Sequence, residues 1–413
     1  MKRLISTLAA AGLLSAAAAT QAGEIVLGQL MDRTGPTANV GTNLGTGFND
    51  YIKLINKGGG VEGHTLRVIE VDNQYKVPPS VEAYQRFKAS GAVLVGLYGT
   101  PQTQALTADL HKDKIPGTSP GFGSAASADG ESYPYLFPVA ASYWSQAGGA
   151  IEFAKSELGG SLKGKKIAYL FYDNPAGREG LPVIRELSKI EGFTLQEFPV
   201  PAPGVEMSNQ VRDISRRFRA DFVVSHLFGR APSVQLKEFN RAGFPLSKVV
   251  SFVWGASEAD INAAGGFDKN VGYNGIQFAG VGDDFPIRQQ IRDMYKAEGK
   301  SAPKEMDSTV FYNRGLLIGA LHVEAVRNAV KSKGGSADIN GTDVRDGFRA
   351  IKDFSLGGLL PPLNLSGGDH EGGGWVRVFT VTKDGFQAKT DWYKGYRDIV
   401  FKMIKEDAAK KKK

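Results

Sequence analysis

The chain has 413 residues, which is longer than one hydrophobic core usually covers and therefore predicts two lobes. Hydrophobic residues (42%) and charged residues (23%) occur as in soluble globular proteins, and zero cysteines exclude disulfides, thiolate catalysis and cysteine-ligated metals. The net charge is +7, but much of the excess lies at the ends, in Lys2, Arg3 and Lys410 to Lys413, which argues against nucleic acid as a partner.

The first 22 residues have the pattern of a Sec signal peptide. Lys2 and Arg3 precede an apolar run over residues 4–19, which is too short to span a membrane with ease. Thr20 and Ala22 then provide the small residues of a cleavage site. A buried N-terminal helix is the alternative. We expect export to the periplasm without a lipid anchor, because the chain has no cysteine, and a soluble mature protein, because no later stretch offers about 18 uninterrupted apolar residues.

Strand-like and helix-like patterns alternate from residue 24 onward. Strands are expected over residues 24–29, 66–71 and 92–98, and helices over residues 43–57, 79–89 and 104–114. Three consecutive glycines, Gly58 to Gly60, end the first helix. This βαβαβα order predicts a parallel sheet covered by helices.

A second unit of the same kind follows. It has expected helices over residues 145–158, 180–191, 208–219 and 233–242, and expected strands over residues 166–172, 193–200, 221–226 and 248–254. The last third differs. Helices are expected over residues 285–299, 307–330 and 342–352, and then a hairpin of residues 375–382 and 385–392 turns at Lys383-Asp384-Gly385. Residues 403–413 are expected to be a basic tail, with its end, Lys410 to Lys413, frayed.

Two motifs with catalytic or cofactor associations lack the parts that their chemistry needs. Residues 117–121 match the G-x-S-x-G nucleophile elbow, but the residue after the serine is Pro120, which has no N–H for an oxyanion hole. Residues 121–126 match G-x-G-x-x-A, but they follow no apolar strand and no acidic residue stands about 20 positions on. The five histidines are scattered. We therefore predict no catalytic residue, no metal site and no cofactor.

Small and polar residues gather where the predicted strands of the first unit end. Ligands of doubly wound sheets bind outside the carboxyl ends of the strands, where free N–H groups and hydroxyls suit a carboxylate. Any single loop is explained equally well by ordinary turn chemistry, but several together favour a site. The candidates from this unit are Thr34, Tyr98, Thr100, Gln102, Thr103, Gly121, Phe122 and Gly123.

The second unit contributes aromatic and polar residues at corresponding places. Tyr143 stands where the two units join, Asn174 and Phe228 follow predicted strands, and Trp254 ends one. Each aromatic residue alone is as often a core residue, but several at strand ends indicate a ligand cleft.

The opening of the chain resembles the type I periplasmic binding proteins typified by the leucine/isoleucine/valine-binding protein. The resemblance rests on a strand followed by Thr34-Gly35-Pro36 and Gly41, a helix ending at Asn56 and Gly58-Gly59, and Asp72 after the next strand. Residues 173–177 and 241–245 resemble two further loops of the family.

This resemblance implies an α/β protein of two Rossmann-like lobes joined by three hinge crossovers. We expect an N-terminal lobe of residues 23–142 and 279–352 and a C-terminal lobe of residues 143–278 and 353–402. The crossings should lie near Ser142, Ala279 and Asp353. A structure with two lobes each made from one continuous segment would contradict this.

The resemblance also places the ligand. By position, the loop that holds a ligand carboxylate falls on residues 100–103, and a second loop falls on residues 121–124. Glu258 is the counterpart of the acid that holds an α-amine, although its sequence context is equally that of a helix N-terminus. The expected ligand is a small carboxylate, either an aromatic acid or a branched-chain type of amino acid.

The function that follows is non-enzymatic. We expect a monomer that closes on one small molecule and delivers it to the membrane permease of an ABC importer. A ligand-sensing receptor subunit is an alternative that the fold does not separate from transport. A secreted α/β hydrolase is a weaker alternative, because no nucleophile with a base is found.

Overall fold

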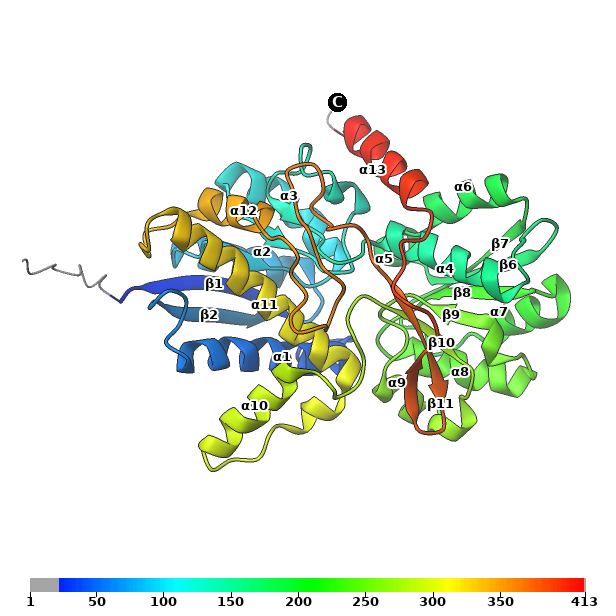
Figure 1. Ribbon diagram of the computed structural model, residues 1–413. Coiled ribbons are helices and arrows are strands. Elements are labelled where there is room, and N and C mark those ends of the chain that lie inside the picture. The colour runs from blue at the N-terminus through cyan, green and yellow to red at the C-terminus, as the bar shows by residue number, and fades with distance from the viewer. Residues whose placement is uncertain (1–21, 412–413) are drawn as a thin grey trace, which may run out of the picture.

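The computed structural model describes residues 22–411, and these form two α/β lobes, each built around its own sheet (Figure 1). The predicted signal peptide falls on residues 1–21 and Ala22, so nearly all of it lies outside the described residues. No helix among residues 22–411 has the length and apolar character needed to cross a membrane.

The first lobe has a five-stranded parallel sheet in the order β2-β1-β3-β4-β5. Helices from the start of the chain and from its last third cover this sheet (Figure 1). Its elements are β1 (Glu24–Met31), α1 (Ala38–Lys57), β2 (Thr65–Asp72), α2 (Val77–Ala89), β3 (Leu94–Gly96), α3 (Thr100–Asp113), β4 (Gly117–Thr118), η1 (Ala125–Ala128), β5 (Leu136–Phe137), α10 (Pro286–Ala297), η5 (Lys304–Asp307), α11 (Thr309–Ser332) and α12 (Gly341–Arg349).

The second lobe has a seven-stranded sheet in the order β12-β11-β10-β9-β8-β6-β7. Strands β6 to β10 pair in parallel, and the late hairpin of β11 and β12 adds an antiparallel edge. Its elements are α4 (Tyr143–Glu157), β6 (Lys166–Tyr172), α5 (Pro175–Arg178), α6 (Leu181–Glu191), β7 (Thr194–Val200), α7 (Ser208–Arg212), η2 (Asp213–Phe218), β8 (Phe222–His226), α8 (Ala231–Ala242), η3 (Leu246–Lys248), β9 (Val249–Ser251), α9 (Glu258–Ala263), η4 (Phe267–Lys269), β10 (Asn274–Gln277), β11 (Arg377–Thr382) and β12 (Gly385–Ala388).

Helices α1 and α11 pack together unusually closely over the first sheet. A β-carbon added at Gly47 of α1 would lie 2.2 Å from the carbonyl oxygen of Tyr312, and one added at Gly315 of α11 would lie 2.0 Å from that of Leu44. Only glycine fits at both positions, since real side-chain carbons never approach a backbone oxygen so closely. The two helices therefore form a rigid layer beside the cavity described below.

Several elements differ from the expectation from sequence. The loop expected at residues 100–103 is the first turn of α3, because Pro101 is well suited to the start of a helix. Strands β4 and β5 have two residues each, and β10 has four, so they are too short to show a period. A strand was expected over residues 248–254, but β9 ends at Ser251, so Trp254 lies beyond the end of the strand.

The basic tail expected over residues 403–413, with a frayed end from Lys410, is wrong for the residues that the structure describes. Residues Arg397–Lys411 form helix α13, which packs against α4 of the second lobe and η1 of the first and lies above the two lobes in Figure 1. Val400, Ile404 and Ala408 recur every four residues and are buried, which anchors the helix. In the sequence, the lysines of the exposed face of this helix obscure the pattern of buried apolar residues.

The segment after α12 also departs from the expected crossing at Asp353. It stays with the first lobe as far as His370, whose ring stacks on Phe137 of β5 with 3.9 Å between the ring centroids. The backbone N–H of His370 donates to the carbonyl of Ala128 in η1. This segment was placed in the C-terminal lobe, but these contacts hold it against the N-terminal one, so the chain leaves the first lobe after residue 370.

Candidate ligand-binding site

The main cavity of the described chain lies where the carboxyl ends of the first sheet meet the second lobe. About 560 Å³ of space there is not occupied by protein atoms, a figure that includes space open to solvent. No charged side chain lines it. The lining residues are Gln29, Thr37, Val40, Leu44, Tyr75, Gly96, Leu97, Tyr98, Gly99, Thr100, Thr118, Pro120, Phe122, Tyr143, Phe228, Trp254 and Ile318.

Aromatic rings from both lobes form the outer part of the cavity. Tyr75 of the first lobe lies 6.1 Å from Phe228 of the second, and Phe122 of the first lies 6.1 Å from Trp254 of the second, measured between ring centroids. Such separations fit the offset and edge-on packing that aromatic rings prefer. Flat apolar walls of this kind suit a ring or a branched hydrocarbon.

Helix α3 presents its N-terminus to the cavity. Thr100, the first residue of the helix, lines the cavity, and the preceding Gly99 provides no side-chain cap. In the first turn of α3, Pro101 has no N–H and the Thr103 N–H donates to the carbonyl of Gly99, so the N–H groups of Thr100 and Gln102 are the ones without a partner inside the helix. Together with the helix dipole they favour an anion. The fully buried amide of Gln102, the third residue of the helix, has neither its nitrogen nor its oxygen paired.

Two buried tyrosine hydroxyls lie beside this helix end, and that of Tyr98 already donates to Thr37. Burial raises the pKa of Tyr98 and of Tyr143 well above the ordinary range, so both phenols stay protonated. The Tyr98 hydroxyl lies 3.1 Å from that of Thr37, which in turn donates to the buried carboxylate of Asp32. This chain of hydroxyls fixes the orientation of Tyr98 in the cavity wall.

Six of the thirteen candidate site residues line the cavity together. They are Tyr98, Thr100, Phe122, Tyr143, Phe228 and Trp254. They come from both lobes and are all buried. Their contact with a ligand remains a prediction.

Four candidates stand directly behind this wall and support it. The backbone N–H of Gly123 is already used, since it donates to Thr100 Oγ1 at 3.1 Å. Thr103 Oγ1 donates to the carbonyl of Gly99, and the Gln102 side chain folds over Gly99. The carbonyl of Gly121 accepts the Trp254 indole N–H at 3.0 Å.

Two further candidates lie away from the cavity and have local roles. Thr34 is exposed and donates to Asp72 Oδ2 at 2.6 Å, and its neighbour Thr37 lines the cavity instead. Asn174 caps α5, where its side-chain oxygen accepts the N–H of Gly177. Both are explained by turn and capping chemistry, the alternative weighed for such loops.

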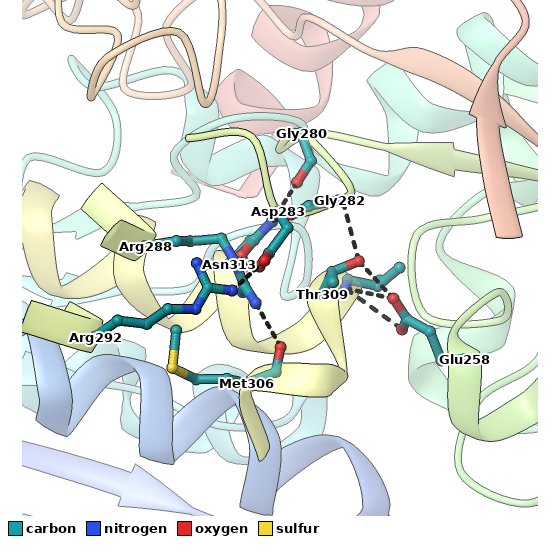
Figure 2. A network of polar contacts seen from close by, with 10 residues as sticks. Glu258, Gly280, Gly282, Asp283, Arg288, Arg292, Met306, Thr309 and Asn313 are labelled. Carbon is teal, nitrogen blue, oxygen red and sulfur yellow. Dashed lines mark hydrogen bonds and ion pairs between the residues drawn. The ribbon is translucent and has the colours of Figure 1, made fainter. Parts of the chain in front are cut away.

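Glu258 also lies outside the cavity lining and instead joins the two lobes. Its carboxylate, at the start of α9, accepts the Thr309 hydroxyl and the Val310 N–H at the start of α11 (Figure 2). Burial raises the pKa of Glu258, and these donors oppose that rise. A carboxylate engaged in this way is not free to hold a ligand amine.

The same region holds the crossover between the lobes in place. The amide of Asn313 donates to the carbonyls of Gly280 and Gly282 at 3.0 Å each (Figure 2). Arg288 donates to Asn313 Oδ1 and to the carbonyl of Met306, both at 2.7 Å. The crossover is thus tied to α10 and α11 of the first lobe.

The lobes touch across the cavity, so the structure has the closed arrangement. The Trp254 bond to Gly121 crosses between them, as does a bond from Asn39 Nδ2 to the carbonyl of Gly229 at 3.1 Å. Glu179 of the second lobe accepts the Ala125 N–H and the Gln104 amide of the first at 3.4 and 3.3 Å.

The sequence analysis missed the inner half of the lining. Val40, Leu44 and Ile318 are apolar residues of α1 and α11 that resemble any core position. Gln29 gave a usable signal, because it is an amide in the otherwise apolar strand EIVLGQLM. Among residues 22–411 no group of acidic or histidine side chains is arranged to hold a metal ion.

A family model and solved structures match this chain, and these matches agree with one another. A family model described as periplasmic binding protein matches residues 24–386. A crystal structure from the Pseudomonas fluorescens group, described as an ABC transporter permease, is 31% identical with a TM-score of 0.85, and the match covers 94% of this chain and 96% of that one.

Two more distant structures share the fold. A branched-chain amino acid ABC transporter protein from Thermus thermophilus with bound valine is 20% identical, with a TM-score of 0.78 over 92% of this chain and 98% of that one. An ABC transporter solute binding protein from R. palustris in complex with benzoate is 18% identical, with a TM-score of 0.69 over 89% and 96%.

Proposed function

This chain belongs to the family of type I periplasmic binding proteins, and from that premise we propose that it is the receptor of an ABC importer for a small aromatic carboxylate. The ligand would occupy the cavity between the lobes. The observation that carries the proposal is the lining of that cavity, which combines aromatic rings from both lobes with the uncapped N-terminus of α3 and has no charged side chain.

The carboxylate is supported by the donors at one end of the cavity. The first turn of α3 and the protonated Tyr143 hydroxyl offer hydrogen bonds without a dedicated cation. Arg314 adds positive potential nearby, since its guanidinium lies 4.8 Å from the centre of the Trp254 ring. Valine and benzoate, bound by two relatives of this fold, both carry a carboxylate.

An aromatic body is favoured over an α-amino acid because the cavity offers an amine no acid. Glu258, the expected partner of an α-ammonium group, is bound to the start of α11. A buried ammonium without a counter-charge is costly, whereas a neutral ring gains from contact with Tyr75, Phe122, Phe228 and Trp254.

Binding without catalysis is supported by the serine motif. The Ser119 hydroxyl is buried without a hydrogen-bond partner, and the residue after it is Pro120. A nucleophilic serine needs a base within hydrogen-bond reach and an oxyanion hole. Export to the periplasm, a monomeric state and delivery to a membrane permease belong to the same proposal, and the family assignment supports the extracytoplasmic location.

A thermal-shift panel tests the ligand class. Aromatic acids, branched-chain amino acids, aromatic amides and sugars would be added to the purified protein at equal concentration. A ligand that binds only the folded state raises the melting temperature by mass action. We expect aromatic acids to give the largest shift. A larger shift with leucine or with sugars would contradict the proposal, and chemical conversion of any bound compound would contradict the non-enzymatic role.

A further inference from the structure

We infer that the inner end of the cavity is a polar subsite, formed by Gln29 and Thr118, that recognises a hydroxyl group of the ligand at the end opposite its carboxylate. This inference rests on the proposed function, because it assumes that the acid group occupies the N-terminus of α3. It concerns a part of the lining that lies inside the first lobe, between its sheet and helices α1 and α11.

The strand pairing brings the two side chains together. Gln29 of β1 pairs with Gly96 of β3, and Gly96 pairs with Thr118 of β4. Residues in register on adjacent parallel strands point to the same face, and the strands lie about 4.8 Å apart. Gly96 therefore leaves a gap in the middle of a row that has a polar side chain at each end.

The Gln29 amide fills this gap in a defined orientation. A β-carbon added at Gly96 would lie 1.9 Å from Gln29 Oε1, so the side chain lies directly over the glycine. Gln29 Nε2 donates to the carbonyl of Leu30 at 2.9 Å, which fixes which end of the amide is the nitrogen. Oε1 is buried without a partner, and Gln29 lines the cavity. The subsite thus holds a free acceptor.

Thr118 supplies the matching donor. Its hydroxyl oxygen lies 2.7 Å from His322 Nε2 on α11, while His322 Nδ1 is buried without a partner. Burial lowers the pKa of His322 to about 3, so the ring is neutral and carries one proton. A buried N–H without a partner is costlier than an unused lone pair, which favours the proton on Nε2, donated to Thr118. The Thr118 hydroxyl proton is then free for a ligand.

A free acceptor beside a free donor matches the two roles of a hydroxyl group. A hydrocarbon end or a methyl group would leave both buried groups unpaired, and sites of this kind reject ligands that lack the hydrogen-bonding group. Thr100 is four positions after Gly96, a span of at most about 14 Å. A ring between a carboxylate and a hydroxyl has a length within that limit.

Matched pairs of acids test the subsite by calorimetry. The first set is 4-hydroxybenzoate, benzoate and 4-methylbenzoate, in which the methyl group controls for size. The second set is 3-(4-hydroxyphenyl)propanoate and 3-phenylpropanoate, so that the result does not depend on one ligand length. In the unmodified protein we expect the hydroxylated acid of at least one set to bind about 10-fold or more tightly than its partners.

Variants assign that preference to the subsite. Gln29→Met keeps the approximate volume and removes the acceptor, so it should abolish the preference while benzoate still binds. Thr118→Val should also reduce the preference. Circular dichroism and the melting temperature show whether Gln29→Met folds, and if it does not, Thr118→Val tests the subsite in its place. Ser119→Ala is the control, because Ser119 is the next residue but does not line the cavity, and it should leave the preference unchanged.

Two results overturn the inference in different ways. Equal affinity for hydroxylated and unhydroxylated acids in the unmodified protein, or a preference that survives in Gln29→Met, contradicts the subsite and leaves the proposed function in place. Binding of none of these acids, together with tight binding of leucine or a sugar, contradicts the proposed function, and the subsite fails with it.

Discussion

Trp254 of the second lobe contacts both the cavity and the first lobe. Its ring lines the cavity, and its indole N–H donates to the carbonyl of Gly121. Replacing it with alanine should raise the Kd of an aromatic acid about 30-fold to 1,000-fold, since buried aromatic contacts dominate such sites.

Calorimetric titration of Trp254→Ala and Trp254→Phe measures this effect. The phenylalanine variant keeps an aromatic wall and loses only the bond to Gly121, so its loss should be clearly smaller. An unchanged Kd in the alanine variant would remove Trp254 from the ligand site.

Glu179 makes ligand binding depend on pH. Burial raises the pKa of this carboxyl to about 7, from an ordinary value of 4.5, and Lys411 of α13 lowers it while Asp407 raises it. Its remaining partners are the Ala125 N–H and the Gln104 amide of the first lobe. Opening the lobes would expose Glu179 and return its pKa towards 4.5, so the closed form binds the proton more tightly.

The direction of the pH dependence follows from this difference in the pKa of Glu179 between the closed and open forms. The closed state is favoured at low pH, and this contribution is lost as the pH rises from 4.5 through 7. An acid whose own carboxyl stays ionised should therefore bind roughly 10-fold or more tightly at pH 5.5 than at pH 8. Titrations at both pH values, with Glu179→Gln as the control that flattens the dependence, measure the effect. Affinity that increases with pH would contradict the role given to Glu179.

For individual residues, the sequence predicted the outer part of the cavity lining better than the inner part. Tyr98, Phe122 and Trp254 stand near strand ends, where topology alone indicates a cleft. Gln29 and Thr118 became neighbours only through the pairing of β1, β3 and β4, and β4 has two residues, too few for a strand to be predicted.

Among the elements, α13 shows how a charged surface can conceal a packed helix. Ile404 is fully buried against the rest of the structure, whereas Lys402 is exposed. Ile404→Ala should lower the free energy of unfolding by about 2–4 kcal/mol through the cavity that it leaves. Lys402→Ala should change it by less than about 0.5 kcal/mol.

Urea unfolding of the two variants side by side tests this packing. Equal and small effects would mean that the helix contributes nothing to stability, as a frayed tail would.

The order of the longer strands and helices was predictable because their hydrophobic patterns extend over several turns or residues. Strands β4, β5 and β10 were not, because their pairing depends on neighbours distant in sequence.

For the whole molecule, the account predicts a change of shape on binding. Ring contacts such as Phe122 to Trp254 require both lobes to be together, so a ligand held by both half-sites should shift the molecule to the closed form. Small-angle scattering should give a smaller radius of gyration with a bound aromatic acid than without it. Identical curves would contradict hinge closure. The two-lobed architecture was predictable from chain length and repeated α/β order. That residues 353–370 stay with the first lobe was not, because it depends on the packing of His370 against Phe137.

The most direct test of the central claim is a calorimetric titration of the mature protein with benzoate and with leucine at neutral pH. The account predicts one benzoate per chain with micromolar affinity, a binding free energy of about −8 kcal/mol, and weaker binding of leucine because no acid in the cavity holds its amine. Tight binding of leucine with no measurable binding of benzoate would contradict it.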